Sequence, residues 1–341
     1  MSAWTDPVAV IGAGAWGTTI ARMLGERGIP VRLWAVDEAL AKEIRDNREN
    51  VTFLPDAKLP ETVAVSCDGP TVLWDVSAVI WVVPSRWLRE VARNLAPNVD
   101  TSVLQICATK GIERETGLRM SEVISEELAG EEAKGLQARF VALSGPNLSR
   151  EINEGHPALS TAASHSEERS HAAQHLLTSP LFRVYRNPDI IGVELCGALK
   201  NVIAIAAGMS DGLGLGANAR AALITRGLAE MRRLGVKMGA HEQTFAGIAG
   251  MGDLVTTATS RLSRNYSTGY RLAQGETREQ IEASMQAVAE GIWTTRAEIE
   301  IASRLNVEVP IAEAVNAVLF GDRTPSEAAE MLMTREQRAE F

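Results

Sequence analysis

Residues 8–17 read VAVIGAGAWG, and this stretch decides the fold. Four apolar residues are followed directly by G-x-G-x-x-G at Gly12, Gly14 and Gly17, and then by a segment that predicts a helix over 18–26. The first glycine permits a tight turn, the second lets the backbone approach a pyrophosphate, and the third lets helix and strand pack closely. The helix N-terminus also offers free N–H groups to phosphates. The stretch predicts a dinucleotide-binding turn; a glycine-rich turn without a ligand is the alternative.

Apolar runs and helix-like segments alternate on either side of this stretch through the first half of the chain. The runs are almost entirely apolar, as expected for strands covered on both faces. The alternation predicts a Rossmann-type, doubly wound parallel sheet. Two further runs, 158–163 and 182–185, are candidates to extend it. We expect the other strands at 8–11, 31–34, 63–67, 78–83, 103–108 and 140–143, and helices that include 18–26, 85–95 and 116–128.

The composition changes after about residue 188, where β-branched runs become rare and alanine, leucine and glutamate dominate. We therefore predict an α/β fold, with a dinucleotide-binding Rossmann-type domain over 1–190 followed by an all-helical domain over 191–341. The first helix of the second domain, about 193–209, is apolar on nearly every face, which predicts that it is buried.

Composition excludes several classes of protein. The chain has 341 residues, of which 45% are hydrophobic and 23% charged, as in ordinary folded proteins. Its net charge of −9 argues against a nucleic-acid partner. Cys67, Cys107 and Cys196 form neither a disulfide framework nor a zinc motif. No Lys or Arg precedes the first apolar run, and Glu194 and Lys200 interrupt the best membrane-span candidate. We expect a cytoplasmic protein with no integral membrane segment, and leave a homodimer open.

The choice between NAD and NADP is not decided by the sequence. The strand predicted at 31–34 ends without the Asp or Glu that usually accepts the ribose hydroxyls of NAD. Position 36 is Val36, so no arginine follows the strand to hold the 2′-phosphate of NADP. Asp37 lies slightly further on, where it is equally suited to bind ribose or to cap a helix. NAD(H), NADP(H) or both remain candidate cofactors.

Two other motifs carry no function in our interpretation. His171 and His175 are four residues apart and could share a helix face as metal ligands, but charged neighbours at 167–169 favour a solvated face. The sequence at 208–212, GMSDG, matches G-x-S-x-G but follows a predicted helix where that motif requires a strand. We predict no metal site.

Lys200 lies where a lysine is unexpected, in the apolar helix over 193–209. Cys196, Ile203 and Ala207 occupy its own face, so the ammonium should be partly desolvated. Desolvation lowers the pKa of an amine, as proton transfer near neutral pH requires. The alternatives are a lysine that extends to the surface or one that pairs with a carboxylate such as Glu194.

A second polar cluster follows Gly252-Asp253 and includes Ser263, Arg264 and Asn265. At a helix start, Ser263 can cap and Arg264 can give a bidentate contact to phosphate. These residues predict a phosphate pocket, and an exposed loop with solvated arginines is the alternative.

Together these segments resemble the bacterial NAD(P)-dependent sn-glycerol-3-phosphate dehydrogenase family from Ile11 to about Glu313. The chain departs from the family where SGPNLS at 144–149 replaces the frequent SGPSFA, and where many members have an arginine near Val36. The matching segments are GAGAWG (12–17), FLP (53–55), ATKG (108–111), SGP (144–146), ELCGALKN (194–201), GDL (252–254), SRN (263–265) and VAEG (288–291).

The resemblance implies a role for each residue that matches a family motif. It makes Lys200 the catalytic base and acid, and it places Lys110 in contact with both substrate and nicotinamide. It implies substrate contacts from Lys110, Gly145, Asn147, Lys200, Asn201, Asp253, Ser263, Arg264 and Asn265. It implies dinucleotide contacts from Gly12, Gly14, Ala15, Trp16, Gly17, Lys110, Ser149, Arg264, Val288 and Glu290.

The implied reaction is the reversible NAD(P)H-dependent reduction of dihydroxyacetone phosphate to sn-glycerol 3-phosphate, which supplies glycerophospholipid synthesis. Asp253 could bind the substrate hydroxyl or hold Lys200 in place. The alternatives are a dehydrogenase for 3-hydroxyacyl or 2-hydroxy acid substrates, which would usually need a histidine base, and a non-enzymatic NAD(H) sensor.

Overall fold

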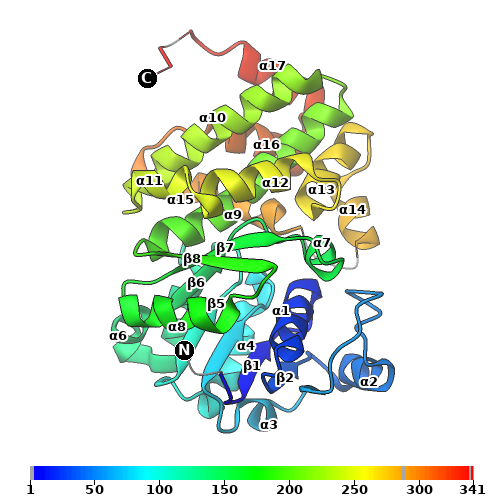
Figure 1. Cartoon of the computed structure of the whole chain (residues 1–341). Coiled ribbons are helices and arrows are strands. Elements are labelled where there is room, and N and C mark those ends of the chain that lie inside the picture. Colours follow the sequence, from blue (N-terminus) through cyan, green and yellow to red (C-terminus); the bar gives the residue numbers. More distant parts are fainter. Residues whose placement is uncertain (1–3, 286–288, 338, 341) are drawn as a thin grey trace. The chain divides into compact units, whose positions relative to one another are not determined.

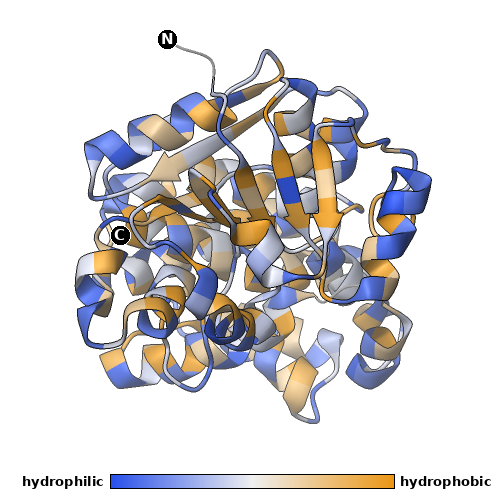
Figure 2. Ribbon diagram, turned by 90° about the horizontal axis from the view of Figure 1, so that it is seen from below, coloured by the Kyte–Doolittle hydropathy of each residue, from blue (hydrophilic) through white to orange (hydrophobic). Residues whose placement is uncertain are grey.

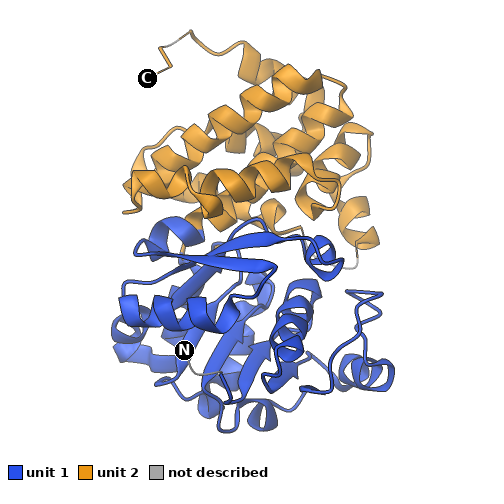
Figure 3. Ribbon diagram, viewed as in Figure 1, with its two compact units in different colours: residues 1–113, 118–194 blue, residues 114–117, 195–341 orange. Residues whose placement is uncertain are grey.

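The structure, a computed structural model, describes residues 4–285, 289–337 and 339–340 (Figure 1). The chain divides into two compact units (Figure 3). The first unit comprises residues 1–113 and 118–194, and the second comprises 114–117 and 195–341. Helix α9 (Ile190–Gly212) begins in the first unit and continues into the second.

The first unit is built on one eight-stranded sheet with the order β3-β2-β1-β4-β5-β6-β7-β8. Neighbouring strands are parallel except β6 and β7, which are antiparallel. The strands are β1 (Val8–Ile11), β2 (Val31–Trp34), β3 (Val63–Ser66), β4 (Ala78–Trp81), β5 (Leu104–Cys107), β6 (Val141–Ser144), β7 (Ala158–Ala163) and β8 (Phe182–Asn187).

This sheet confirms the predicted Rossmann-type fold, including the extension by β7 and β8. The antiparallel β6–β7 pair departs from the all-parallel prediction. The helix expected over 116–128 begins later, at Met120, and ends at Ala129. Gly117 adopts a left-handed φ of +74°, and a bridge between Ile112 and Arg119 closes a loop there, so the helix cannot start at 116.

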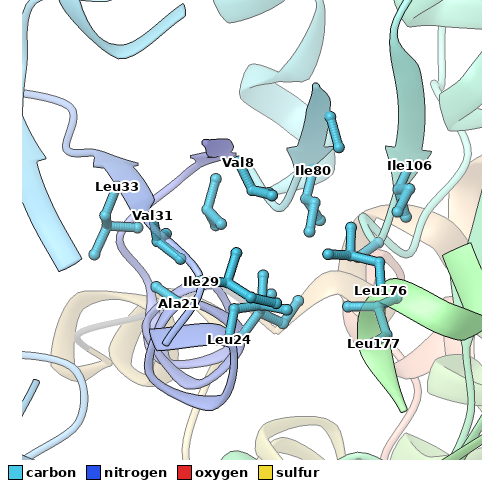
Figure 4. Close-up of a cluster of buried hydrophobic side chains, with 14 of the residues drawn as sticks. Val8, Ala21, Leu24, Ile29, Val31, Leu33, Ile80, Ile106, Leu176 and Leu177 are labelled. Atoms are coloured by element: carbon cyan, nitrogen blue, oxygen red, sulfur yellow. The ribbon is translucent and has the colours of Figure 1, made fainter. Parts of the chain in front are cut away.

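In the first unit, helices flank the sheet, and buried apolar side chains fill the space between the sheet and the helices. Val8, Val31 and Ile80 from the strands meet Leu24 of α1 and Leu176 of α8 in this core (Figure 4). Figure 2 shows the strands mostly in the hydrophobic colour, whereas the helices carry both colours. The helical segments of this unit before α9 are α1 (Ala15–Glu26), α2 (Glu38–Asn47), α3 (Gly69–Leu73), α4 (Ser85–Leu95), η1 (Ala96–Asn98), α5 (Met120–Ala129), η2 (Gly130–Glu132), α6 (Ala133–Gln137), α7 (Ser149–Asn153) and α8 (Glu167–Leu177).

The strand order reverses direction at β1, which lies between β2 and β4. Ile11 at the end of β1 aligns with Trp34 of β2 and Trp81 of β4, so the three strands end at one edge. In open parallel sheets, ligands bind outside the carboxyl ends of strands at such a reversal. The glycine turn follows β1 at this point.

The second unit is helical. Its core helix, α9, is long and apolar enough to cross a membrane by length and composition, contrary to the expectation that Glu194 and Lys200 would interrupt such a stretch. However, 94% of its most apolar window is buried inside the protein, as in a core helix. The other segments are α10 (Gly216–Lys237), α11 (Glu242–Phe245), the π-helical turn η3 (Ile248–Gly252), α12 (Asp253–Thr259), α13 (Arg264–Ala273), α14 (Arg278–Ser284), α15 (Glu290–Leu305), α16 (Pro310–Phe320) and α17 (Pro325–Met333).

Helices α9 and α13 approach each other through glycines. A Cβ added to Gly208 would lie 2.0 Å from the Tyr266 carbonyl oxygen, and one added to Gly269 would lie 1.9 Å from the Ile205 carbonyl oxygen. Neither distance is possible for real atoms, so only glycine allows the two backbones to come this close. The crossing fixes the start of α13 beside α9.

Glu230 and Glu298 are buried carboxyl groups of the second unit. Glu230 accepts hydrogen bonds from the amides of Ile311 and Ala312, both at 2.9 Å, and so caps α16. Glu298 of α15 is fully buried, and neither of its carboxyl oxygens has a hydrogen-bond partner in the described structure. Burial raises the pKa of Glu230 from 4.5 to about 7, and burial together with Glu230 raises the pKa of Glu298 well above its ordinary value.

We predict that this pair makes the protein less stable as pH rises. Raised pKa values mean that the folded state binds protons more tightly than the unfolded state. The contribution of these two groups to the free energy of unfolding is therefore fully present below about pH 4.5 and is lost as pH rises through about 7. Glu298→Gln should therefore increase the free energy of unfolding at pH 8 by on the order of 1–3 kcal/mol, with little effect near pH 4.5. Chemical denaturation of both proteins across this pH range measures the difference.

Glu300→Gln is the matched control, because this side chain is on the same helix and 52% exposed. It should change stability by less than about 0.5 kcal/mol at either pH. A Glu298→Gln variant that is less stable than the parent at pH 8 would contradict the assignment of a neutral, buried Glu298.

Candidate functional site

The three glycines of the turn after β1 each do what the motif requires. Gly12 has a left-handed φ of +118°, and a Cβ there would lie 2.7 Å from the Val82 carbonyl oxygen. A Cβ on Gly17 would lie 1.9 Å from the Gly12 carbonyl oxygen, so this glycine lets α1 pack against the turn. A Cβ on Gly14 would meet no heavy atom within 4 Å, which leaves its backbone open on the side where a pyrophosphate would approach.

The first turn of α1 suits an anion. The N-cap of α1 is Gly14, so no side chain caps the first amides of the helix, and the first turn contains no acidic residue. Ala15 and Trp16 are the first two helical residues, and the Trp16 ring packs 6.0 Å from that of Phe182. The first backbone amides of α1, at the positive end of the helix dipole, are therefore available to an anion. The turn fits a dinucleotide pyrophosphate.

At the end of β2, the structure shows that Asp37 caps a helix. Its Oδ1 accepts a hydrogen bond of 2.8 Å from the amide of Leu40 and so begins α2. Val36 beside it is 67% exposed. The capping alternative raised by the sequence is thus confirmed for one carboxyl oxygen of Asp37.

Three predicted substrate residues of the first unit lie together after β5 and β6. Lys110 Nζ donates a hydrogen bond of 3.0 Å to the Gly145 carbonyl oxygen. Asn147 Nδ2 donates to the Leu159 carbonyl oxygen at 3.1 Å, and its Oδ1 accepts from the Ser160 hydroxyl at 3.1 Å. The Asn147 amide therefore binds the loop after β6 to β7. Ser149, a predicted dinucleotide contact, is the first residue of α7.

In the second unit, Lys200 is only 5% exposed and does not extend to the surface. Its Nζ forms an ion pair with Asp253 and donates a hydrogen bond of 2.7 Å to the Thr257 hydroxyl. The alternative that Lys200 pairs with a carboxylate is therefore confirmed, but the partner is Asp253 and not the suggested Glu194, which binds Arg119 and accepts hydrogen bonds from the amide and hydroxyl of Ser121. Of the two roles considered for Asp253, this geometry shows that it holds Lys200.

The sequence places Thr257 in the polar cluster that follows Asp253, but its contact with Lys200 was not predicted. The π-helical turn η3 leads directly into Asp253, the first residue of α12, and Thr257 follows one helical turn later. Its hydroxyl donates to the Asp253 carbonyl oxygen at 2.7 Å, which orients its lone pairs toward Lys200. The spacing of four residues between Asp253 and Thr257 places both on one helix face and is the signal that could have found it.

Amide side chains connect the starts of two helices to α9. Asn265 Nδ2 donates to Asn201 Oδ1 at 2.8 Å, and Asn265 Oδ1 accepts from the amide of Gly291 at 2.9 Å. Ser263 caps α13 by accepting from the amide of Tyr266 at 3.3 Å, as expected. Glu290, adjacent to Gly291, is the first residue of α15. The structure therefore groups Asn201, Asn265 and the first turn of α15.

Arg264 begins α13 and is exposed. Among the described residues it has neither an ion pair nor a side-chain hydrogen bond, although the Glu290 carboxylate acts on it electrostatically. A guanidinium at a helix N-terminus suits a phosphate group, although desolvation by burial lowers the pKa of Arg264. Val288, a predicted dinucleotide contact, lies outside the described residues.

The fold and the glycine turn define a dinucleotide-binding α/β protein with a helical second unit. Two family profiles match the chain, the N-terminal region of NAD-dependent glycerol-3-phosphate dehydrogenase at residues 7–170 and its C-terminal region at 189–330. The chain belongs to the NAD-dependent glycerol-3-phosphate dehydrogenase family, as the resemblance indicated.

Individual relatives agree with this assignment. The chain is 49% identical to a glycerol-3-phosphate dehydrogenase [NAD(P)+] of Citrifermentans bemidjiense over 98% of this chain and 99% of the relative. It is 47% identical to one of Syntrophotalea carbinolica, with coverage of 98% and 99%. The crystal structure of glycerol-3-phosphate dehydrogenase from Coxiella burnetii matches with a TM-score of 0.91 at 36% identity, covering 98% of this chain and 100% of that one.

We predict that alanine at Gly14 and at Gly17 will have different effects. Gly14→Ala should fold normally, because its Cβ meets nothing, but should weaken dinucleotide binding by at least about tenfold through contact with the pyrophosphate. Gly17→Ala should lower the free energy of unfolding by roughly 2 kcal/mol or more, because its Cβ collides with backbone. Thermal unfolding and NADH fluorescence titration measure the two effects. A Gly14→Ala protein with parental affinity for NADH would contradict this role of the turn.

Proposed function

We propose that this chain reduces dihydroxyacetone phosphate to sn-glycerol 3-phosphate, reversibly, with NADH or NADPH as the reductant. The observation that carries the proposal is the buried Lys200 amine, held by Asp253 and Thr257. The relatives of this chain that are named glycerol-3-phosphate dehydrogenase [NAD(P)+] support the choice of substrate and cofactor. The turn at Gly12, Gly14 and Gly17 fits the pyrophosphate of such a cofactor.

Lys200 is proposed to move the proton. When bound, the reduced nicotinamide supplies a hydride to the keto carbon, and the negative charge develops on the keto oxygen. The Lys200 ammonium donates a proton to that oxygen, which completes the alcohol and leaves a neutral amine. In the reverse direction the neutral amine accepts the hydroxyl proton as hydride leaves the carbon.

Asp253 and Thr257 orient this amine. An ammonium has three N–H donors, and these two partners direct two of them. The negative charge of Asp253 also favours the protonated form of Lys200, which is the form that reduction consumes. The low polarity of the buried site strengthens the interaction of the ammonium with a developing alkoxide.

The remaining contacts are proposed from the residues that match family motifs. An exposed Arg264 would hold the phosphate, and binding of this remote group would orient the keto end. Lys110 would contact substrate and nicotinamide and stabilise the same alkoxide. The other proposed substrate contacts are Gly145, Asn147, Asn201, Asp253, Ser263 and Asn265, and the other dinucleotide contacts are Ala15, Trp16, Ser149, Val288 and Glu290.

We also propose that the enzyme works in the cytoplasm, where its product would serve as a precursor for glycerophospholipids. Sedimentation of the purified chain distinguishes the monomer from a homodimer.

A substrate panel tests the proposed function. We expect NADH oxidation with dihydroxyacetone phosphate to exceed that with acetoacetyl-CoA, pyruvate or unphosphorylated dihydroxyacetone by at least about a hundredfold in kcat/KM, because the proposed contacts would bind a phosphate and a small ketone. A preference for acetoacetyl-CoA or pyruvate would assign another dehydrogenase. Absence of turnover with every ketone, together with tight NADH binding, would assign a sensor.

Arg264→Met should remove most of the advantage of the phosphorylated ketone and leave the slow rate with dihydroxyacetone unchanged. Arg232→Met is the matched control, because Arg232 is in the same unit and pairs with Glu242 on the surface. Equal loss for both ketones in Arg264→Met would show that Arg264 does not bind the phosphate.

A further inference from the structure

The loop that follows β6 holds the Lys110 ammonium and itself lies against β7. Lys110 Nζ donates a hydrogen bond of 3.0 Å to the Gly145 carbonyl oxygen of this loop. Gly145 has a φ of +154°, and a Cβ there would lie 2.8 Å from the Leu159 carbonyl oxygen and 2.9 Å from the Ser160 Cα. The backbones of the loop and of β7 are therefore in contact, so the groups that join them help to set where Lys110 Nζ lies.

The Ser160 hydroxyl reaches this loop on both sides of Gly145. Ser160 lies in β7 and is fully buried. Its hydroxyl lies 3.0 Å from the carbonyl oxygen of Ser144, which precedes Gly145, and 3.1 Å from Oδ1 of Asn147, which follows it. A hydroxyl has one proton, so Ser160 donates to one of these two acceptors at a time. Either hydrogen bond ties the loop to the strand.

The Asn147 amide attaches the loop to the same strand. Its Nδ2 donates to the Leu159 carbonyl oxygen at 3.1 Å, while its Oδ1 faces the Ser160 hydroxyl. An amide carries its donor and its acceptor on different atoms, so Asn147 bonds two successive residues of β7. Loss of the Ser160 hydroxyl would remove the donor to Asn147 Oδ1 and a donor to the Ser144 carbonyl oxygen.

We propose that Ser160 is a positioning residue in the reduction of dihydroxyacetone phosphate. Its hydroxyl fixes the loop after β6 on β7, and the Gly145 carbonyl of that loop orients the Lys110 ammonium toward the reacting oxygen. Ser160 acts through Lys110, without a contact of its own with substrate or cofactor. A misplacement of about 1 Å at a reacting centre can cost about a hundredfold in rate. The inference rests on the proposed function, in which Lys110 stabilises the alkoxide.

Ser160→Ala removes the hydroxyl with little change in volume. It should lower kcat for dihydroxyacetone phosphate reduction by about ten- to a hundredfold, because the Lys110 ammonium is no longer held at the reacting oxygen. Ser160→Cys keeps a weaker donor of similar size and should give a kcat between those of the parent and the alanine variant. If Ser160→Ala does not fold, as judged by thermal unfolding, the cysteine variant takes its place in the measurements below.

Combination with Lys110→Met distinguishes positioning from a general loss of structure. If Ser160 acts through Lys110, Ser160→Ala should lower kcat by less than about twofold in a chain that already carries Lys110→Met. An equal loss of kcat with and without Lys110→Met would overturn the inference, because the hydroxyl would then affect the rate by another route. A Ser160→Ala chain that keeps the parental kcat would overturn it as well.

Ser164→Ala is the matched control. Ser164 is also buried, and its hydroxyl donates to the Phe140 carbonyl oxygen at 2.7 Å, at the opposite end of the β6–β7 pair. Its loss should lower the Tm about as much as Ser160→Ala does, while kcat stays within about twofold of the parental value. An equal loss of kcat in Ser164→Ala would overturn the assignment to Ser160. Absence of dihydroxyacetone phosphate reduction by the parent chain would overturn the proposed function and this inference with it.

Discussion

The ion pair between Lys200 and Asp253 is the interaction on which the helical unit depends. A charge taken out of water is costly unless it is paired and hydrogen-bonded, and here a lysine on a buried helix meets a carboxylate that is 1% exposed. Thr257 adds a third polar group to the pair. Without Asp253 the Lys200 charge on the apolar helix α9 would lose its ion-pair partner, so the same contact that orients the amine for proton transfer also stabilises its burial.

The glycine contacts of the second unit serve this arrangement. Gly208 and Gly269 let α13 cross α9 with the backbones in contact, and η3 delivers Asp253 to the start of α12. The amides of Asn201 and Asn265 then join α9 to the starts of α13 and α15. The first unit is organised in a comparable way by Gly12 and Gly17, so in both units close backbone approach positions the polar groups.

Local patterns predicted much of this architecture, and long-range contacts explain what they missed. The strand at 8–11, its glycine turn and the buried setting of Lys200 were all predictable, because each depends on residues close in sequence. The partner of Lys200 was not predictable, because tertiary packing brings Asp253 to it, whereas Glu194 is the carboxylate that lies nearer in sequence. The antiparallel direction of β7 was missed because contacts across the sheet decide strand direction. The late start of α5 was missed because it follows from the left-handed backbone of Gly117.

The central claim is that the Lys200 amine supplies the proton, and amine rescue of Lys200→Ala tests it most directly. The account predicts that dihydroxyacetone phosphate reduction falls by roughly a thousandfold in this variant while NADH affinity is kept, and that added ethylammonium restores part of the rate in proportion to its concentration. Reduction by Lys200→Ala at close to the parental rate without any added amine would contradict the account.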